Sequence, residues 1–188
     1  PKKVKDYFNT ENYNFGDITK LIGVKRSFEI IEKAINERKK IFIYGDYDVD
    51  GVTSTVILYK SLKALGADVF YYIPNRVKDG YGLNVNAIER LIEKGMDLLI
   101  TCDNGIAAIE EIKYAKEKGI DVVIYDHHEP VIKDGKEVLP EADSVTDAKI
   151  ENCGYDFTVM CAGGLCYRVM KAFYEYLGEK YTLEEEMV

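Results

Sequence analysis

The stretch that decides the fold is YGDYDVDG, residues 44–51, which follows the apolar run IFI. The short β-branched and aromatic segment at 40–44 predicts a buried strand. Directly after it, Asp46, Asp48 and Asp50 stand at every second position. A single aspartate after a strand is about as often a turn former or a helix N-cap as part of a functional site. A functional interpretation of these three acids therefore needs support from other parts of the chain.

Strands and helices alternate through the rest of the sequence. Apolar runs predict strands at 68–73, 96–102 and 120–125, with a weaker one at 142–146, and KDGKE at 133–137 is a predicted turn. The predicted helices are at 26–39, 53–66, 85–95, 106–119 and 165–178. This alternation predicts an α/β fold, in which a parallel, doubly wound, Rossmann-like sheet of about five strands carries helices on both faces.

The composition is that of a globular protein of one domain. The chain has 188 residues, of which 47% are hydrophobic and 31% are charged. Neither end has a signal-peptide pattern or an apolar stretch that could span a bilayer, so we expect a cytoplasmic protein. The four cysteines form no C-x-x-C pair, which favours reduced thiols, with Cys161 and Cys166 packed in the core.

The net charge of −8 argues against a broad nucleic-acid-binding surface, because Lys and Arg supply much of the affinity for phosphates. It does not exclude a nuclease whose carboxylates hold divalent cations, since the cations then set the charge that a phosphate meets. The positions of the acids are therefore more informative than their number.

Acids and histidines also follow two other predicted strands. Asp103 comes after the third strand, in TCDNG, and Asp126, His127 and His128 come after the fourth, in YDHHEP. The carboxyl ends of the strands of an open parallel sheet line one shared crevice. We therefore expect these side chains to converge with the three acids of the first strand.

Several carboxylates in one crevice raise one another's pKa unless cations compensate their charge. Carboxylate oxygens together with imidazole suit Mn²⁺, Mg²⁺ or Fe²⁺. The number of candidate ligands exceeds what one ion needs, which favours two ions bridged by a shared carboxylate, as in phosphoryl-transfer enzymes. One histidine ring would bind metal and the other would face the substrate.

Two other α/β enzyme and signalling folds also place acids at strand ends. DVDGV at 48–52 mimics the nucleophile motif of haloacid-dehalogenase phosphatases, but there the aspartate comes immediately after the strand, whereas GDY intervenes here. A receiver-type signalling domain needs a lysine after its last strand, where this chain has His127 and His128.

The ordered set YGDYDVDG, PNRVKDGYGLN, TCDNG and DHHEP resembles the DHH phosphoesterase superfamily and, within it, the bacterial single-strand-specific DNA exonucleases. The likeness covers residues 41–130 and extends more loosely to about residue 170. It implies a two-metal hydrolase that removes mononucleotides from the 5′ end of single-stranded DNA in repair and recombination, with two Mn²⁺ or Mg²⁺ ions as cofactors. The implied metal ligands are Asp46, Asp48, Asp50, Asp103 and His127.

The resemblance also implies roles for other residues. Asp103 would bridge the two ions, His128 would lie by the scissile phosphate, and Asp126 would orient the histidines, so that these three residues form the implied catalytic set. The implied substrate-binding residues are Asn75, Arg76, Tyr81, Gly82, Asn104 and Gly105. Arg76 suits a phosphate contact, and Tyr81 either stacks on a base or anchors its loop.

The sequence departs from the family pattern in three places. Thr146 and Asp147 replace an Asn-Pro or Asp-Pro pair, CAGG replaces a Gly-Ala-Gly order, and the family's last metal-binding aspartate has no counterpart here. We therefore expect residues 1–188 to be a DHH catalytic domain, with a helical lead-in at 1–39 and a core at 40–180, which lacks its C-terminal part and the second domain. A capping box at 182–185, close to the end of the chain, supports this, and we expect the fragment alone to have weak or no activity.

Two alternatives remain at this point. Other DHH relatives hydrolyse short oligonucleotides or cyclic dinucleotides, although the extended GDYDVDG motif favours the exonucleases. A DHH domain can also be an inactive scaffold, which loss of ligands would indicate, yet every ligand expected within 41–130 is present. The implied partner is single-stranded DNA, with a single-strand-binding protein and a helicase as further candidates, no membrane, and a monomeric state.

Overall fold

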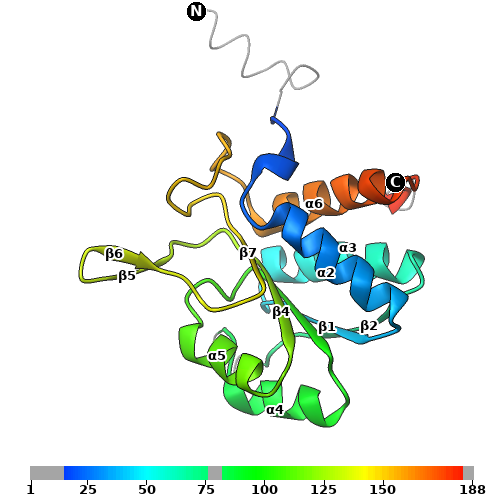
Figure 1. Cartoon of the computed structure of the whole chain (residues 1–188), viewed down its shortest axis with the longest axis horizontal. Coiled ribbons are helices and arrows are strands. Elements are labelled where there is room, and N and C mark those ends of the chain that lie inside the picture. Colours follow the sequence, from blue (N-terminus) through cyan, green and yellow to red (C-terminus); the bar gives the residue numbers. More distant parts are fainter. Residues whose placement is uncertain (1–14, 76–81, 184–188) are drawn as a thin grey trace, which may run out of the picture.

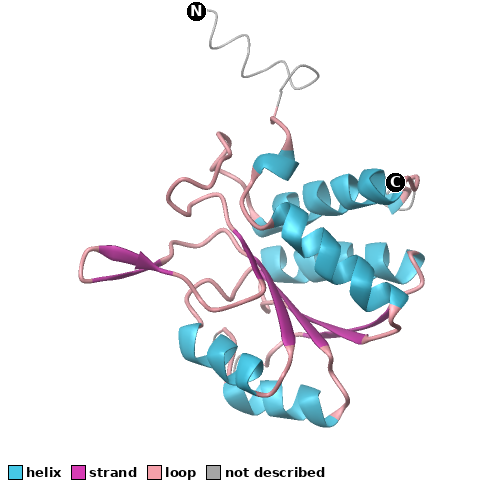
Figure 2. Ribbon diagram, in the orientation of Figure 1, coloured by secondary structure: helices cyan, strands magenta, loops and turns pink. Residues whose placement is uncertain are grey.

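Five parallel strands form the central sheet of the computed structural model, which describes residues 15–75 and 82–183. The strands are β1 (Lys40–Tyr44), β2 (Asp68–Tyr72), β3 (Leu98–Cys102), β4 (Asp121–Tyr125) and β7 (Ser144–Thr146). Their order across the sheet is β2-β1-β3-β4-β7, and each neighbouring pair is parallel. The predicted parallel sheet of about five strands is confirmed, including the weaker strand β7 (Figure 2).

Helices cover both faces of this sheet, as predicted. The helices are α2 (Val24–Asn36), α3 (Val49–Ala64), α4 (Val85–Glu93), α5 (Ile109–Glu117) and α6 (Ala162–Leu177), preceded by the 3-10 helix η2 (Ile18–Lys20). α2, α3 and α6 lie on one face, and α4 and α5 lie on the other (Figure 1). The protein is therefore a three-layer sandwich of helices, sheet and helices.

Alternate residues of each strand face opposite layers. In β1, Ile41 and Ile43 belong to the larger apolar cluster, beneath α2, α3 and α6, whereas Phe42 and Tyr44 belong to the smaller one, beneath α4 and α5. All four side chains are buried. This explains why the strands read as continuous apolar runs, since a parallel sheet covered on both faces has no solvent-exposed side.

The larger cluster is closed by contacts between helices and sheet. Phe28 of α2 packs on Phe173 of α6, with ring centroids 5.2 Å apart. The buried Tyr125 hydroxyl donates a hydrogen bond of 2.7 Å to Ser27 Oγ of α2, and the Tyr174 hydroxyl of α6 donates one of 2.7 Å to the Ser61 carbonyl of α3. These contacts fix α2, α3 and α6 relative to the sheet.

Several element boundaries differ from those predicted. α3 begins at Val49 rather than at residue 53, so the second half of the acidic motif lies in its first turn. At 133–137, where the sequence predicts only a turn, β5 (Val131–Lys133) and β6 (Lys136–Val138) form an antiparallel hairpin that projects from the sheet (Figure 1). The hairpin turn contains Asp134 and Gly135, both with positive φ (53° and 74°), a combination typical of tight hairpin turns.

All four cysteines are free thiols. Cys166 is buried in the larger cluster, as predicted, but Cys161 is exposed, and that prediction is wrong. Cys161 precedes α6 as its N-cap, and its Sγ accepts a hydrogen bond of 3.3 Å from the Gly164 amide. Within residues 15–75 and 82–183, no helix has the length and apolar character that crossing a membrane requires.

The packing of α6 on α2 gives a first prediction. Phe173→Ala removes a fully buried ring and leaves a cavity, so we expect the free energy of unfolding to fall by about 3–5 kcal/mol. Phe70→Ala serves as the control, because Phe70 is 41% exposed on the edge strand β2 and its loss should cost much less. Urea titration followed by circular dichroism measures both values, and equal losses would contradict this account of the core.

Candidate metal centre

The carboxyl ends of β1, β3 and β4 meet at one edge of the sheet, where most of the predicted site residues lie. Asp103 directly follows β3 and Asp126 directly follows β4. Because Cys102 is in register with Tyr125, these two aspartates leave the sheet side by side. The acidic turn after β1 lies next to them, since Tyr44 is in register with Thr101 of β3.

The turn between β1 and α3 is held by a capping interaction. Asp48 is the N-cap of α3, and its Oδ1 accepts a hydrogen bond of 2.9 Å from the Gly51 amide. This hydrogen bond is the main reason why the pKa of Asp48 lies below its ordinary value. Asp48 therefore carries a negative charge at the site, and capping and ligation are compatible roles for it.

Two glycines allow the chain to turn this tightly. A Cβ atom on Gly51 would lie 2.6 Å from both the amide nitrogen and the carbonyl oxygen of Asp46. A Cβ atom on Gly45 would lie 2.0 Å from Thr55 Oγ1. The glycines of GDYDVDG are thus explained by the close approach of the first two turns of α3 to the loop that carries Asp46.

Asp50 links the start of α3 to the start of α6. Its two carboxylate oxygens accept hydrogen bonds from the backbone amides of Ala162 (2.8 Å) and Gly163 (2.7 Å). The side chain also approaches the histidine pair, with Oδ2 lying 3.5 Å from His127 Nε2. A carboxylate is favoured at this position because the N-terminus of a helix attracts negative charge.

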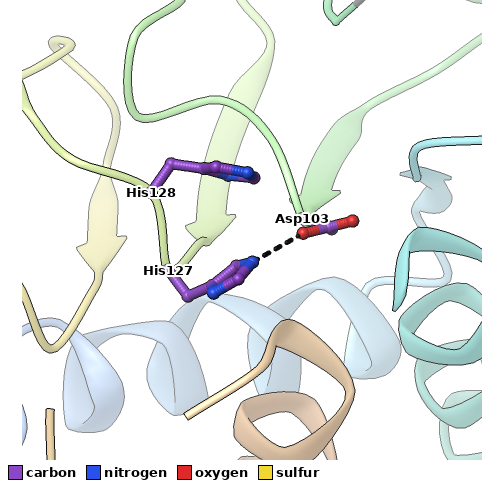
Figure 3. A group of neighbouring side chains, drawn as sticks. All are labelled: Asp103, His127 and His128. Carbon is purple, nitrogen blue, oxygen red and sulfur yellow. Dashed lines mark hydrogen bonds and ion pairs between the residues drawn. The ribbon is translucent and has the colours of Figure 1, made fainter. Parts of the chain in front are cut away.

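Asp103 is a buried acid that interacts with a histidine. It has a left-handed backbone, with φ 60°, and is 2% exposed. Its Oδ1 lies 3.0 Å from His127 Nε2 (Figure 3). Burial, followed by the charges of Asp50 and Asp48, raises the pKa of Asp103 to about 8. A buried carboxyl among other carboxylates requires a proton or a cation to offset its charge.

Two groups of possible ligand atoms share Asp103. The first consists of Asp46, Asp48 and Asp103, and the second consists of Asp103, His127 and His128. Within each group the candidate ligand atoms all lie within 4.8 Å of one another. The predicted convergence of the three strand ends is therefore observed, and Asp103 occupies the position between the two groups.

The side chain of Asp126 holds the DHH turn, residues 126–128, in place through hydrogen bonds. Its Oδ1 accepts hydrogen bonds from the His127 amide (2.8 Å) and from His128 Nδ1 (2.7 Å), while its Oδ2 accepts one of 2.9 Å from the Ile106 amide. The hydrogen bond to Asp126 is the main cause that raises the pKa of His128 to about 8. The His128 ring is consequently held in one orientation and kept protonated near neutral pH.

The predicted substrate-binding residues fall into three groups. Gly82, Asn104 and Gly105 line a cavity that His128 also lines, next to the acidic cluster. Asn75 is exposed in the loop after β2. Arg76 and Tyr81 lie outside the residues that the structure describes, so their predicted contacts are not tested.

Asp147 was not among the predicted site residues. It directly follows β7, next to Asp126, because the Asp126 amide donates to the Thr146 carbonyl. Asp147 is fully buried, and burial raises its pKa to about 7. Its Oδ1 accepts a hydrogen bond of 2.8 Å from the Lys149 amide, whereas Oδ2 has no partner among the described residues. The rule that acids at strand ends converge would have identified it from the predicted strand at 142–146.

The family model described as the N-terminal domain of the DHH family matches residues 40–188 of this chain. The chain belongs to the DHH family. The match includes the acidic turn after β1, Asp103 and the DHH turn itself.

Among the members of the DHH family, the chain is similar to RecJ proteins. It is 42% identical over 173 residues to the single-stranded-DNA-specific exonuclease RecJ of Bacillus subtilis, which covers 92% of this chain and 21% of the relative. A crystal structure of exonuclease RecJ bound to manganese superimposes with a TM-score of 0.77 at 32% identity, covering 87% of this chain and 40% of that one. RecJ of Thermus thermophilus in complex with Mn²⁺ gives a TM-score of 0.72 at 30% identity, covering 87% and 22%. The chain thus spans about a fifth of the length of the Bacillus relative.

The close approach at Gly51 gives a second prediction. Gly51→Ala places a methyl group against the backbone of Asp46, so we expect the free energy of unfolding to fall by about 1–3 kcal/mol. The matched control is Gly164→Ala in α6, whose Cβ would meet side-chain atoms and no backbone: Met160 Cγ at 3.3 Å and Cys161 Sγ at 3.5 Å. Urea unfolding of both variants tests this, and a Gly51 variant as stable as the control would contradict it.

Burial of Asp147 gives a third prediction, which concerns pH. Because the folded state raises the pKa of this carboxyl to about 7, the folded state binds more protons than the unfolded state between about pH 4 and pH 7. The free energy of unfolding should therefore fall as the pH rises from 5 to 8. Asp147→Asn keeps the acceptor for the Lys149 amide but cannot ionise. We therefore expect the free energy of unfolding of this variant to decrease between pH 5 and pH 8 by on the order of 2 kcal/mol less than that of wild type.

Unfolding of wild type, Asp147→Asn and the exposed control Asp134→Asn is to be measured in chelator at pH 5 and pH 8. Only Asp147→Asn should flatten the pH dependence. Parallel pH dependence in all three proteins would show that Asp147 ionises as freely in the folded state as in the unfolded chain.

Proposed function

We propose that this chain is the DHH catalytic domain of a metal-dependent, single-strand-specific DNA exonuclease, which hydrolyses phosphodiester bonds from the 5′ end and releases mononucleotides in repair and recombination. The observation that carries this proposal is the position of Asp103, shared by the two groups of possible ligands. The similarity to RecJ proteins over most of the chain supports the choice of substrate.

The donor set fits two divalent cations, Mn²⁺ or Mg²⁺. Asp46 and Asp48 would hold one ion with Asp103, and His127 would hold the other with Asp103, with Asp50 as a further ligand near His127. The raised pKa of Asp103 supports this fit, because a cation would replace the proton that the buried carboxyl otherwise takes up. Bound cations supply charge neutralisation for the phosphate and make a water molecule more acidic.

The protein's own residues position and protonate the substrate in this proposal. Asp126 fixes the His128 ring through Nδ1, which leaves Nε2–H as the donor toward a bound phosphate. In the metal-free protein the hydrogen bond to Asp126 raises the pKa of His128 to about 8, and a protonated ring at this position would stabilise negative charge on the phosphate as the bond breaks. Asp126 acts only through the histidines, and it is therefore a positioning residue.

The remaining proposed contacts concern the DNA strand and other proteins. Arg76 would bind a phosphate, and Tyr81 would stack on a base, while Asn75, Gly82, Asn104 and Gly105 would line the path of the strand. A single-strand-binding protein, a helicase and a monomeric state stay predictions.

The fourth prediction tests this function through Asp103→Asn. We expect Mn²⁺-dependent release of mononucleotides from 5′-labelled single strands to fall at least about 100-fold, because the shared ligand is lost. The amide keeps the shape of the side chain and cannot ionise, so the metal-free protein should fold and be at least as stable as wild type. The assay is to use protein expressed from the complete native gene, together with Mn²⁺ titration of the 188-residue chain.

Asp97→Asn provides the control, since Asp97 lies before β3, at the opposite end of the strand from Asp103. Equal hydrolysis by wild type and Asp103→Asn would refute the proposal. Faster hydrolysis of a dinucleotide than of a long strand would indicate the short-oligonucleotide alternative, and Mn²⁺ binding without hydrolysis of either substrate would indicate an inactive scaffold.

A further inference from the structure

Tyr44 is the last residue of β1, directly before the acidic turn, and its side chain is fully buried. The ring lies in the smaller apolar cluster, on the face of the sheet that α4 and α5 cover. The acidic turn leads instead into α3, which covers the opposite face. A hydroxyl buried in an apolar cluster requires hydrogen-bond partners, and the partners of Tyr44 indicate what this residue does.

Two hydrogen bonds join the Tyr44 hydroxyl to residues 82–84, the segment that leads into α4. The hydroxyl donates one of 3.0 Å to the Gly82 carbonyl and accepts one of 3.3 Å from Asn84 Nδ2. Asn84 is also the N-cap of α4, where its Oδ1 accepts a hydrogen bond of 2.8 Å from the Ala87 amide. Because Oδ1 is the acceptor of this cap, Nδ2 is the atom that faces Tyr44. The network therefore runs in one direction, from Asn84 through Tyr44 to Gly82.

The backbone of Tyr44 is also bonded to the turn that follows β3. Its carbonyl oxygen accepts a hydrogen bond of 3.5 Å from Asn104 Nδ2, which also donates one of 3.2 Å to the Cys102 carbonyl. The buried Oδ1 of Asn104 has no hydrogen-bond partner among the described residues. Tyr44 thus joins three segments, namely the acidic turn, residues 82–84 and the TCDNG turn.

Gly82 and Asn104 line the cavity beside His128, and both are proposed to contact the DNA strand, whereas Tyr44 does not line this cavity. We infer that Tyr44 is a positioning residue, which holds residues 82–84 at a fixed place relative to the acidic cluster so that one DNA strand contacts both. The inference rests on the proposed function, because the DNA strand is what these segments would share. Tyr44 acts through Gly82 and does not touch the substrate.

Tyr125 provides a matched comparison within the same sheet. It is the last residue of β4, directly before the DHH turn, and it is fully buried like Tyr44. Its side chain lies in the larger cluster, where its hydroxyl donates a hydrogen bond of 2.7 Å to Ser27 Oγ of α2. Each tyrosine therefore satisfies a buried hydroxyl next to the site, but Tyr125 is bonded to a helix that has no proposed substrate contact.

The test replaces each tyrosine with phenylalanine in protein expressed from the complete native gene. Tyr44→Phe keeps the buried ring but removes the donor to the Gly82 carbonyl. We expect the KM for a 5′-labelled single strand to rise about fivefold, the effect of one hydrogen bond, while kcat and the Mn²⁺ concentration for half-maximal rate stay unchanged. Tyr125→Phe also loses a buried hydrogen bond, yet its KM should equal that of wild type.

Two further measurements do not depend on hydrolysis. Fluorescence anisotropy of a labelled strand in EDTA should give a dissociation constant about fivefold higher for Tyr44→Phe than for wild type or Tyr125→Phe. In the 188-residue chain, hydrogen exchange at the Ala87 amide should be faster in Tyr44→Phe but not in Tyr125→Phe, because Asn84 loses one of its anchors.

An unchanged KM in Tyr44→Phe, or an equal rise in both variants, would overturn the inference and leave the proposed exonuclease activity intact. A lower kcat or weaker Mn²⁺ dependence at an unchanged KM would also overturn it, because the role of Tyr44 would then lie at the metal centre. No hydrolysis by the wild-type protein would refute the proposed function, and the anisotropy titration would still decide whether Tyr44 positions the segment that binds the strand.

Discussion

The repulsion between carboxylates at one edge of the sheet is the constraint on which the rest of the structure depends. The carboxyl ends of the strands of a parallel sheet lie at the same edge, and in this chain aspartates follow four of them, β1, β3, β4 and β7. Asp103, in the middle, is buried deeply enough to favour its protonated form near neutral pH. Bound cations would compensate this repulsion and, unlike protons, would also leave positive charge to attract the phosphate of a substrate.

The aspartates at this edge of the sheet also stabilise the helix termini and the turn around them. Asp48 caps α3, Asp50 accepts two amides at the start of α6, and Asp126 fixes both histidines. A capping role and a ligand role are often treated as competing explanations for an aspartate after a strand. Here the hydrogen bonds that Asp48 and Asp50 accept from the first amides of α3 and α6 also fix the orientation of their carboxylates. The same residues therefore stabilise the fold and form the site.

Most of the fold could be predicted from the sequence, because each strand is a short apolar run that is buried on both faces. The sequence predicts a later start for α3 than the structure shows, because the acids and glycine of DVDG resemble a loop, although Asp48 is a good N-cap and Gly51 is required by close packing. The β5–β6 hairpin was missed because its strands are only three residues long and project from the sheet.

The convergence of Asp48, Asp103 and His127 followed from the position of each residue at a strand end. The same rule would have identified Asp147, which directly follows β7. The buried acceptor of Asn104 could not be predicted in this way, because it depends on how neighbouring segments pack over the strand ends. Periodicity places a residue on an element, but it does not give the number of hydrogen-bond partners that surround its side chain.

The contact between Asp50 and α6 connects the chemistry of the sheet edge to the mechanics of the domain. Charge-assisted hydrogen bonds are roughly twice as strong as neutral ones. Neutralising Asp50 would therefore weaken the two hydrogen bonds that hold the N-terminus of α6, a helix of 16 residues. This helix also carries Phe173 into the larger core. The start of α6 is therefore held by a charge at the sheet edge, while the rest of the helix is held by apolar packing in the larger cluster.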